Sequence, residues 1–282
     1  MDQRLVFDVG AFNGDDTAYY LAQGYRVVTI EADPSAAVKL RVRFAAEIEA
    51  GRCTILNVGV ADQDGEATFY LSDLAVWNSF DRAMATREGH KAREIRVPCR
   101  MFASILREHG VPFYLKVDIE GRDHLCILAL SRDDLPPFVS FEADDDAADL
   151  VRHLDGLGYR KFRLVSQRGW KPVVIPDAGS ARHVIWSGRQ WIRLELRKYS
   201  ALHGALEALR SAFPIAARYA DVPANGGPSS TWRFAPGSSG PMPFEIPGPW
   251  LTMAEFQHTW ICAKTSGILE SSWFDVHAAL EA

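Results

Sequence analysis

The sequence predicts an α/β fold with a mostly parallel central sheet, helices on both faces and a C-terminal elaboration. Over the first 160 residues, apolar strand-like runs alternate with helix-like segments, an order typical of parallel sheets with crossover helices. The composition is that of an ordinary globular protein, because 48% of the 282 residues are hydrophobic, 24% are charged and the net charge is -5.

Apolar periodicity and turn residues locate the elements of this first part. We expect strands at 5–9, 27–31, 54–60, 66–71, 113–118 and 138–142, and an extended segment at 95–97. We expect helices at 16–23, 34–50, 102–109, 122–131 and 147–157. Glycine follows four of these helices, where a left-handed C-cap is favoured: Gly24, Gly51, Gly110 and Gly158. Residues 78–91 are polar and irregular, and predict a loop.

The second part of the chain has a different composition. Seven of the eight Trp lie at or beyond Trp170, and seven of the fifteen Pro lie in 221–250. We expect strands at 160–165, 173–175, 184–186 and 192–196, helices at 202–213, 253–263 and 274–280, and an ordered aromatic loop at 221–250. The sequence therefore predicts a core at 1–160 and a second region at 161–282. The second region would complete the sheet and would either cap the substrate or form oligomers, for which a homodimer is one possibility.

Composition also bears on partners and compartment. The mild acidity argues against a broad nucleic-acid surface, which needs surplus Lys and Arg. No apolar run approaches the roughly 20 residues that span a bilayer, and the first residues lead directly into a strand with no signal peptide. The four cysteines, Cys53, Cys99, Cys126 and Cys262, form no CxxC pair. We therefore expect a reduced, cytoplasmic protein without a membrane span.

A glycine loop and an acidic residue indicate a nucleoside-bearing cofactor. Asp8-Val9-Gly10-Ala11-Phe12-Asn13-Gly14 joins the first strand to the first helix, where glycines allow close approach to a ligand. Glu31 ends the second strand, 21 residues after Gly10, a distance that suits a carboxylate on the ribose hydroxyls.

The loop favours S-adenosylmethionine over NAD. A dinucleotide loop has the pattern GxGxxG, whereas this loop lacks the middle glycine that lets a pyrophosphate come close. Asp8, Asp15 and Asp16 would repel phosphates, but a cationic sulfonium would be stabilised beside Asp8. A plain strand-turn-helix without a ligand is the alternative interpretation of the same residues.

Several segments, in order, resemble the FkbM family of S-adenosylmethionine-dependent methyltransferases. They are Val6 to Gly14, Glu31-x-Asp33-Pro34, Asn57 to Asp62 with Asp64-Gly65, Leu115-Lys116-Val117-Asp118-Ile119-Glu120-Gly121 and Phe141-Glu142. The resemblance covers about 5–159 and implies the Rossmann-like class I methyltransferase fold. Phe12 departs from the pattern, since an asparagine or small residue is common there. Arg122-Asp123 also departs from it, since His-Glu is frequent there.

The donor-binding residues follow from the loop and the resemblance together. The methionine part would be held by Asp8, Gly10, Ala11, Asn13, Gly14 and Thr17. Glu31 would bind the ribose. The adenine would be bordered by Asn57, Val58 and Val60.

Charged residues at the end of the strand predicted at 113–118 are the candidates for catalysis. Strand alternation would place Lys116, Asp118 and Glu120 on one side, at a cost unless they are paired or functional. Asp118 or Glu120 could take the proton of a hydroxyl acceptor, with Lys116 orienting the acceptor or balancing charge. Asp118 and Glu120 with Glu142 could instead hold a divalent ion such as Mg²⁺. A salt bridge that closes the strand end is the structural alternative.

The sequence thus predicts an S-adenosylmethionine-dependent methyltransferase. The resemblance implies O-methylation of a hydroxyl on a sugar or secondary metabolite, so that the partner is a small-molecule or glycan acceptor. Two alternatives stay open, an NAD(P)-dependent oxidoreductase and a catalytically inactive partner protein with a cofactor fold.

Overall fold

A computed structural model describes residues 4–175, 232–235, 237–269 and 273–280. The chain divides into two compact units, Met1–Phe162 with Val276–Ala282, and Arg163–Asp275. This division differs from a single boundary at residue 160, because Val276–Ala282 belongs to the first unit.

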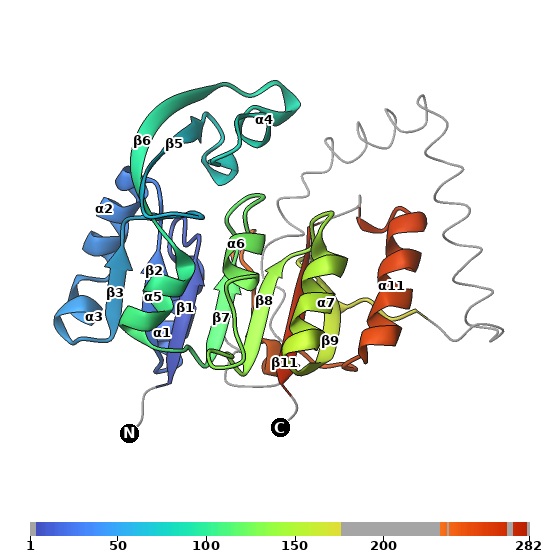
Figure 1. Ribbon diagram of the computed structural model, residues 1–282. Helices are drawn as coiled ribbons and strands as arrows, with labels where there is room; N and C mark the ends of the chain where they lie inside the picture. The colour runs from blue at the N-terminus through green and yellow to red at the C-terminus, as the bar shows by residue number, and fades with distance from the viewer. Residues whose placement is uncertain (1–3, 176–231, 236, 270–272, 281–282) are drawn as a thin grey trace. The chain divides into compact units, whose positions relative to one another are not determined.

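A mostly parallel sheet forms the centre of the first unit (Figure 1). Its strands are β1 (Leu5–Val9), β2 (Arg26–Ile30), β3 (Cys53–Leu56), β7 (Tyr114–Val117), β8 (Phe138–Glu142), β9 (Tyr159–Ser166) and β11 (Phe274–Leu280). Their order is β9-β11-β8-β7-β1-β2-β3, and the four pairs from β8 to β3 are parallel. β1 and β7 are buried along most of their length, which explains why each is apolar without alternation apart from one charged residue, Asp8 in β1 and Lys116 in β7.

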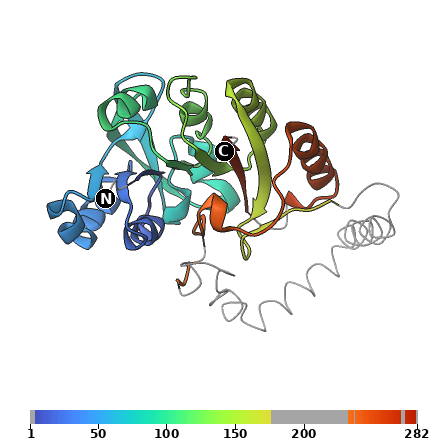
Figure 2. The same ribbon diagram turned by 90° about the horizontal axis from the view of Figure 1, so that it is seen from below.

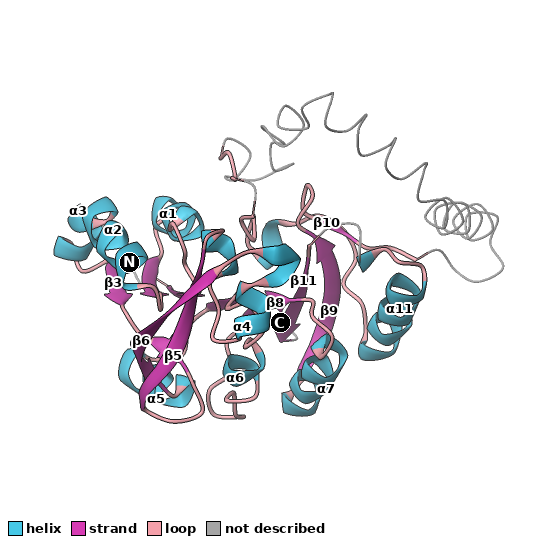
Figure 3. Ribbon diagram, turned by 90° about the horizontal axis from the view of Figure 1, so that it is seen from above, coloured by secondary structure: helices cyan, strands magenta, loops and turns pink. Residues whose placement is uncertain are grey.

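Helices cover both faces of this sheet, as Figures 2 and 3 show. One face carries α1 (Asp15–Ala22), α2 (Pro34–Arg43) and α3 (Ala45–Glu49), and the other carries α5 (Phe102–His109), α6 (His124–Ile127) and α7 (Ala147–Leu157). The ring of Phe102 packs edge-to-face against Phe7 of β1, with centroids 6.2 Å apart. The predicted helix at 34–50 is divided at Phe44, and the one at 122–131 is only four residues long.

A small second sheet is inserted between β3 and α5. It contains β4 (Gly59–Val60), β5 (Gly65–Ser72) and β6 (Ala92–Arg100) in the order β4-β6-β5. Its own apolar cluster includes Phe69 and Phe80, whose ring centroids are 4.8 Å apart. The connection from β5 to β6 contains the short helix α4 (Arg82–Ala85) and lies above the carboxyl ends of β7 and β8 in Figure 1.

The last element corrects a sequence-based expectation. Residues 274–280 were expected to form a short helix, but they form strand β11. The N–H of Leu280 donates to Pro137 O at 3.1 Å, so the end of β11 lies beside the beginning of β8 and the two strands run in opposite directions. Six of the seven residues are buried, so no alternation marks the strand, and tertiary packing overrides the helix preference of two alanines.

The second unit contains β10 (Lys171–Pro172), which pairs with the end of β9, and α11 (Met253–Thr265). The predicted strand at 173–175 is wrong, because β10 ends at Pro172. The helix expected at 253–263 is confirmed and begins at a Thr252–Glu255 capping box. The predictions at 184–186, 192–196 and 202–213 lie outside the described residues. Within the described residues, no helix is long and apolar enough to cross a membrane.

Candidate functional site

A buried ion pair lies below the carboxyl ends of β1 and β7. The parallel register sets Asp8 opposite Lys116, and Lys116 Nζ lies 3.2 Å from Asp8 Oδ1. The ammonium group also donates to Gly10 O at 3.0 Å, while Thr17 Oγ1 donates to Asp8 Oδ2 at 2.5 Å. Asp8 and Thr17 are completely buried. Asp8, Lys116 and Thr17 therefore support the glycine loop from beneath.

The charge of Lys116 is maintained by its neighbours. Burial opposes the charged form, but Asp8, Asp118 and Asp16 together raise the pKa of Lys116 well above its usual value. Asp118 Oδ2 lies 3.7 Å and Asp16 Oδ2 lies 3.9 Å from the ammonium nitrogen. A buried cation with three carboxylates around it leaves the local charge negative.

The two glycines of the loop are required by packing within the protein. Gly10 has a φ of +80°, and a Cβ there would lie 1.7 Å from Asp118 O. Gly14 has a φ of +81°, and a Cβ there would lie 2.5 Å from a methyl group of Leu40. The loop thus lies directly against the segment after β7 on one side and against α2 on the other.

The amide groups of the loop are already bonded to acceptors in the protein. Gly10 and Ala11 both donate to Ile30 O, at 2.9 and 3.2 Å. Phe12 donates to Glu31 Oε2 at 2.7 Å, and Gly14 donates to Ala11 O at 2.7 Å. A pyrophosphate-binding loop needs such N–H groups to be directed at the ligand, and these four are not available for that purpose.

Glu31 joins the loop after β1 to the start of α2. Its two carboxylate oxygens accept one amide each, from Phe12 and from Asp33, both at 2.7 Å. Burial raises the pKa of Glu31 to about 7, although the two amide bonds act in the opposite direction. Each carboxylate oxygen has a second lone pair, so the group can still accept two hydroxyl donors. Asn57 Nδ2 donates to Glu31 O at 2.9 Å and so fixes the backbone at this strand end.

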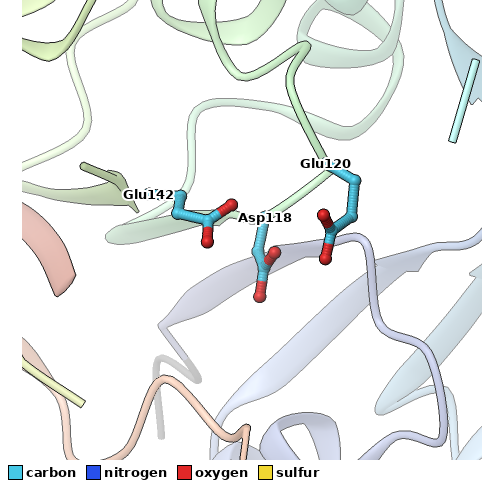
Figure 4. A group of neighbouring side chains, drawn as sticks. All are labelled: Asp118, Glu120 and Glu142. Atoms are coloured by element: carbon cyan, nitrogen blue, oxygen red, sulfur yellow. The ribbon is translucent and has the colours of Figure 1, made fainter. Parts of the chain in front are cut away.

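Three carboxylates gather beyond β7 and β8. Oxygens of Asp118, Glu120 and Glu142 all lie within 4.8 Å of one another, and Figure 4 shows the three side chains side by side. β7 ends at Val117, so the predicted alternation along a strand does not place Asp118 and Glu120. The loop does so, with Glu120 in a left-handed conformation at φ 49°.

Crowding and burial change the protonation of this cluster. Burial, with the charge of Asp118, raises the pKa of Glu120 to about 8, although Arg87 lowers it. Burial, followed by the charges of Asp118 and Glu120, raises the pKa of Glu142 well above its usual value. Glu120 can therefore carry a proton at neutral pH.

Asp123 holds the two acidic segments together. Its carboxylate accepts the amide of Ile119 through Oδ1 and the amide of Glu142 through Oδ2, both at 2.9 Å. Asp123 is buried, and desolvation raises its pKa to about 7. Both carboxylate oxygens of Asp123 are therefore used to position the loop after β7.

Sequence reasoning missed the residues that the β5–β6 connection contributes. Arg87 Nη2 lies 2.9 Å from Glu120 Oε2, and the guanidinium stacks on Trp77 at 4.4 Å from the ring centroid. Ser79, almost completely buried, donates through Oγ to Glu120 O at 2.9 Å. No spacing in the polar segment 78–91 distinguishes Arg87 from the other basic residues of that segment.

The comparison with family models decides the identity of this region. The family described as Methyltransferase FkbM domain matches residues 8–161, which is more than half of the 282 residues. The chain belongs to the FkbM methyltransferase family. S-Adenosylmethionine is the cofactor that this family implies, and the match begins at Asp8 of the glycine loop. No curated protein matches the chain significantly.

Solved methyltransferases resemble the chain at low identity. A precorrin-6y C5,15-methyltransferase from Geobacter metallireducens is 14% identical, with 58% of this chain and 68% of that chain covered and a TM-score of 0.34. An rRNA methylase from Streptococcus thermophilus is 13% identical, with 64% and 82% covered and a TM-score of 0.35. A TehB-like SAM-dependent methyltransferase from Corynebacterium glutamicum is 10% identical, with 63% and 75% covered and a TM-score of 0.35. At such low identities and TM-scores, these three structures say nothing about the substrate of this chain.

The predicted donor-binding residues of this methyltransferase differ in accessibility. Gly10 and Glu31 directly follow β1 and β2, Gly14 is the N-cap of α1, and Asn13 before it is exposed. Val58 is partly exposed, whereas Val60 is buried. The contact of each residue with the donor stays a prediction.

Proposed function

We propose that the chain is an S-adenosylmethionine-dependent O-methyltransferase that acts on a hydroxyl of a sugar or secondary metabolite. The methyl transfer rests on the family, and the hydroxyl preference rests on the resemblance in the sequence motifs. The observation that carries the choice of donor is the glycine loop, whose amides at Gly10, Ala11, Phe12 and Gly14 are all bonded within the protein. Such a loop suits a cationic donor better than a pyrophosphate.

The residues around the loop fit the chemical groups of this donor. Glu31 retains a lone pair on each oxygen for ribose hydroxyls. Asp118 directly follows β7, and its backbone lies against Gly10. Its side chain is 26% exposed, so a carboxylate is accessible beside the glycine loop. When bound, S-adenosylmethionine supplies a methyl group on a positively charged sulfur, which a negative environment stabilises.

Asp118 is the proposed general base. Burial raises the pKa of Glu120 to about 8, so most of this carboxyl already holds a proton at neutral pH, and its Oε2 is paired with Arg87. The Asp118 carboxylate is partly exposed, at 26%, and its Oδ2 lies 3.7 Å from Lys116 Nζ beside the glycine loop. In the transfer, an acceptor oxygen would lose its proton to Asp118 and form its bond to the methyl carbon in line with the departing sulfur.

A divalent ion is the second way in which this cluster could act. Asp118, Glu120 and Glu142 offer oxygens at a suitable mutual distance, and a cation would relieve their repulsion. Arg87 already supplies a positive charge to Glu120, so we favour the mechanism without metal. Turnover that requires Mg²⁺ and stops with a chelator would reverse this choice.

The remaining features support a small acceptor in a reducing compartment. All four cysteines are free thiols, which agrees with a cytoplasmic location. The net charge of -5 favours a small-molecule or glycan acceptor over a nucleic acid. The aromatic residues of 232–250 leave a homodimer open.

Calorimetric titration with S-adenosylmethionine, S-adenosylhomocysteine and NAD tests the proposal. We expect both sulfur compounds to bind and NAD not to bind; tight NAD binding without S-adenosylhomocysteine binding would favour an oxidoreductase. Asp118→Asn separates catalysis from binding. This variant should bind the donor and lose turnover with any acceptor that the unchanged enzyme methylates. Donor binding without turnover on a panel of sugars and hydroxylated metabolites would favour the inactive partner protein.

A further inference from the structure

Phe12 has a conformation and an exposure that the fold itself does not explain. It lies in the glycine loop with φ 48°, in the left-handed region that a bulky residue rarely adopts. Phe12 is 41% exposed. The protein thus holds a strained backbone and an exposed phenyl ring at one position.

The backbone contact of Phe12 accounts for the strain but not for the ring. Its N–H donates to Glu31 Oε2 at 2.7 Å from the left-handed conformation. Glycine or asparagine would adopt the same φ at lower cost and would donate the same amide. A phenyl ring that is 41% exposed gains little from burial, so its presence at a left-handed position points to a role in binding.

The hydrogen bond between the Phe12 amide and Glu31 indicates which part of the donor would lie beside this residue. Glu31 accepts the amide of Phe12 through one oxygen and the amide of Asp33 through the other. A sugar whose two hydroxyls bind this carboxylate would therefore lie beside the residue that contributes the first amide. The apolar face of a sugar ring packs well on an aromatic side chain.

We propose that Phe12 is a donor-binding residue whose ring packs against the ribose half of S-adenosylmethionine. This inference rests on the proposed function and extends it to a residue outside the predicted set of contacts. Binding of the ribose covers the exposed ring, and this contact offsets the backbone strain. The free protein is therefore less stable than it would be with glycine at this position, and the bound protein regains that stability.

The test compares Phe12→Gly, Phe12→Asn and Phe12→Tyr in calorimetric titrations with S-adenosylhomocysteine and with adenosine. The glycine and asparagine variants should weaken the binding of both compounds by about fivefold, the loss expected for one aromatic contact. The tyrosine variant should stay within about twofold of the unchanged protein. In urea, the asparagine and glycine variants should unfold at the same or a higher midpoint, because the strain is relieved.

Glu88→Gly is the matched control. Glu88 also has a positive φ, 57°, and is exposed, but it lies in the β5–β6 connection. Its replacement should relieve strain and leave S-adenosylhomocysteine binding unchanged.

Each outcome decides the inference. Unchanged binding in Phe12→Gly and Phe12→Asn would overturn it, and so would weaker S-adenosylhomocysteine binding with unchanged adenosine binding, which would move the ring away from the ribose. If the unchanged protein binds no S-adenosylhomocysteine, the proposed function fails first, so the two failures are distinguishable.

Discussion

Gly10→Ala is the substitution whose effect the structure defines most sharply. A Cβ at this position would lie 1.7 Å from Asp118 O, whereas real Cβ atoms essentially never approach closer than 3.0 Å. The glycine loop and the segment after β7 must therefore separate by about 1.3 Å, the difference between these two distances. The displaced groups are the backbone beside the donor loop and the backbone that carries Asp118.

Two costs add in this variant. Overpacking of a dense interior costs about 1–3 kcal/mol, and a left-handed conformation costs a non-glycine residue about 1–2 kcal/mol. The free energy of unfolding should therefore fall by about 2–5 kcal/mol. S-Adenosylhomocysteine should also bind more weakly, because the loop moves away from the end of β7.

Gly24→Ala separates the two costs. Gly24 has a similar φ of +87°, but no atom lies within 4 Å of the place where its Cβ would be. Its replacement should lower the free energy of unfolding by about 1–2 kcal/mol, the backbone strain alone, and leave donor binding unchanged. Urea denaturation of the unchanged protein, Gly10→Ala and Gly24→Ala measures the overpacking cost and the backbone strain. Equal losses of stability in Gly10→Ala and Gly24→Ala would refute the steric argument and with it the close approach of the two loops.

The buried charges give two further predictions. Lys116→Met should lower the free energy of unfolding by about 3–5 kcal/mol, because Asp8 is left buried without a cation, and a double variant with Asp8→Asn should regain part of this loss in urea denaturation. An additive double variant would show that the two groups are not coupled. Glu120→Gln should match the unchanged protein in stability near pH 5 and exceed it near pH 9. The reason is that the pKa of Glu120 is raised to about 8, so the folded state holds a proton that the unfolded state has released. Stability therefore falls as pH rises from about 4.5 to about 8, by one to a few kcal/mol for this group. Urea midpoints for both proteins across this pH range measure the difference, and parallel curves would contradict the raised pKa.

Local sequence signals located most of the central elements of the first unit because each carries its own pattern. The apolar run of β1 and the Asp33-Pro34 start of α2 are recognisable without any neighbour, and in the second unit so is the Thr252–Glu255 start of α11. β11 was missed for the opposite reason. It is buried between two other strands, so no alternation survives, and its preference for a strand comes from those neighbours.

The sequence by itself determined the family, the glycine loop and the carboxylates at the strand ends, because these features follow one another along the chain at informative spacings. Only the tertiary structure decided which of them meet and how. It buried Asp8 against Lys116, used the loop amides within the protein and brought Arg87 to Glu120 across 33 residues of sequence. Contacts of this kind depend on strand register and on the path of an inserted hairpin, and no local pattern records either of them.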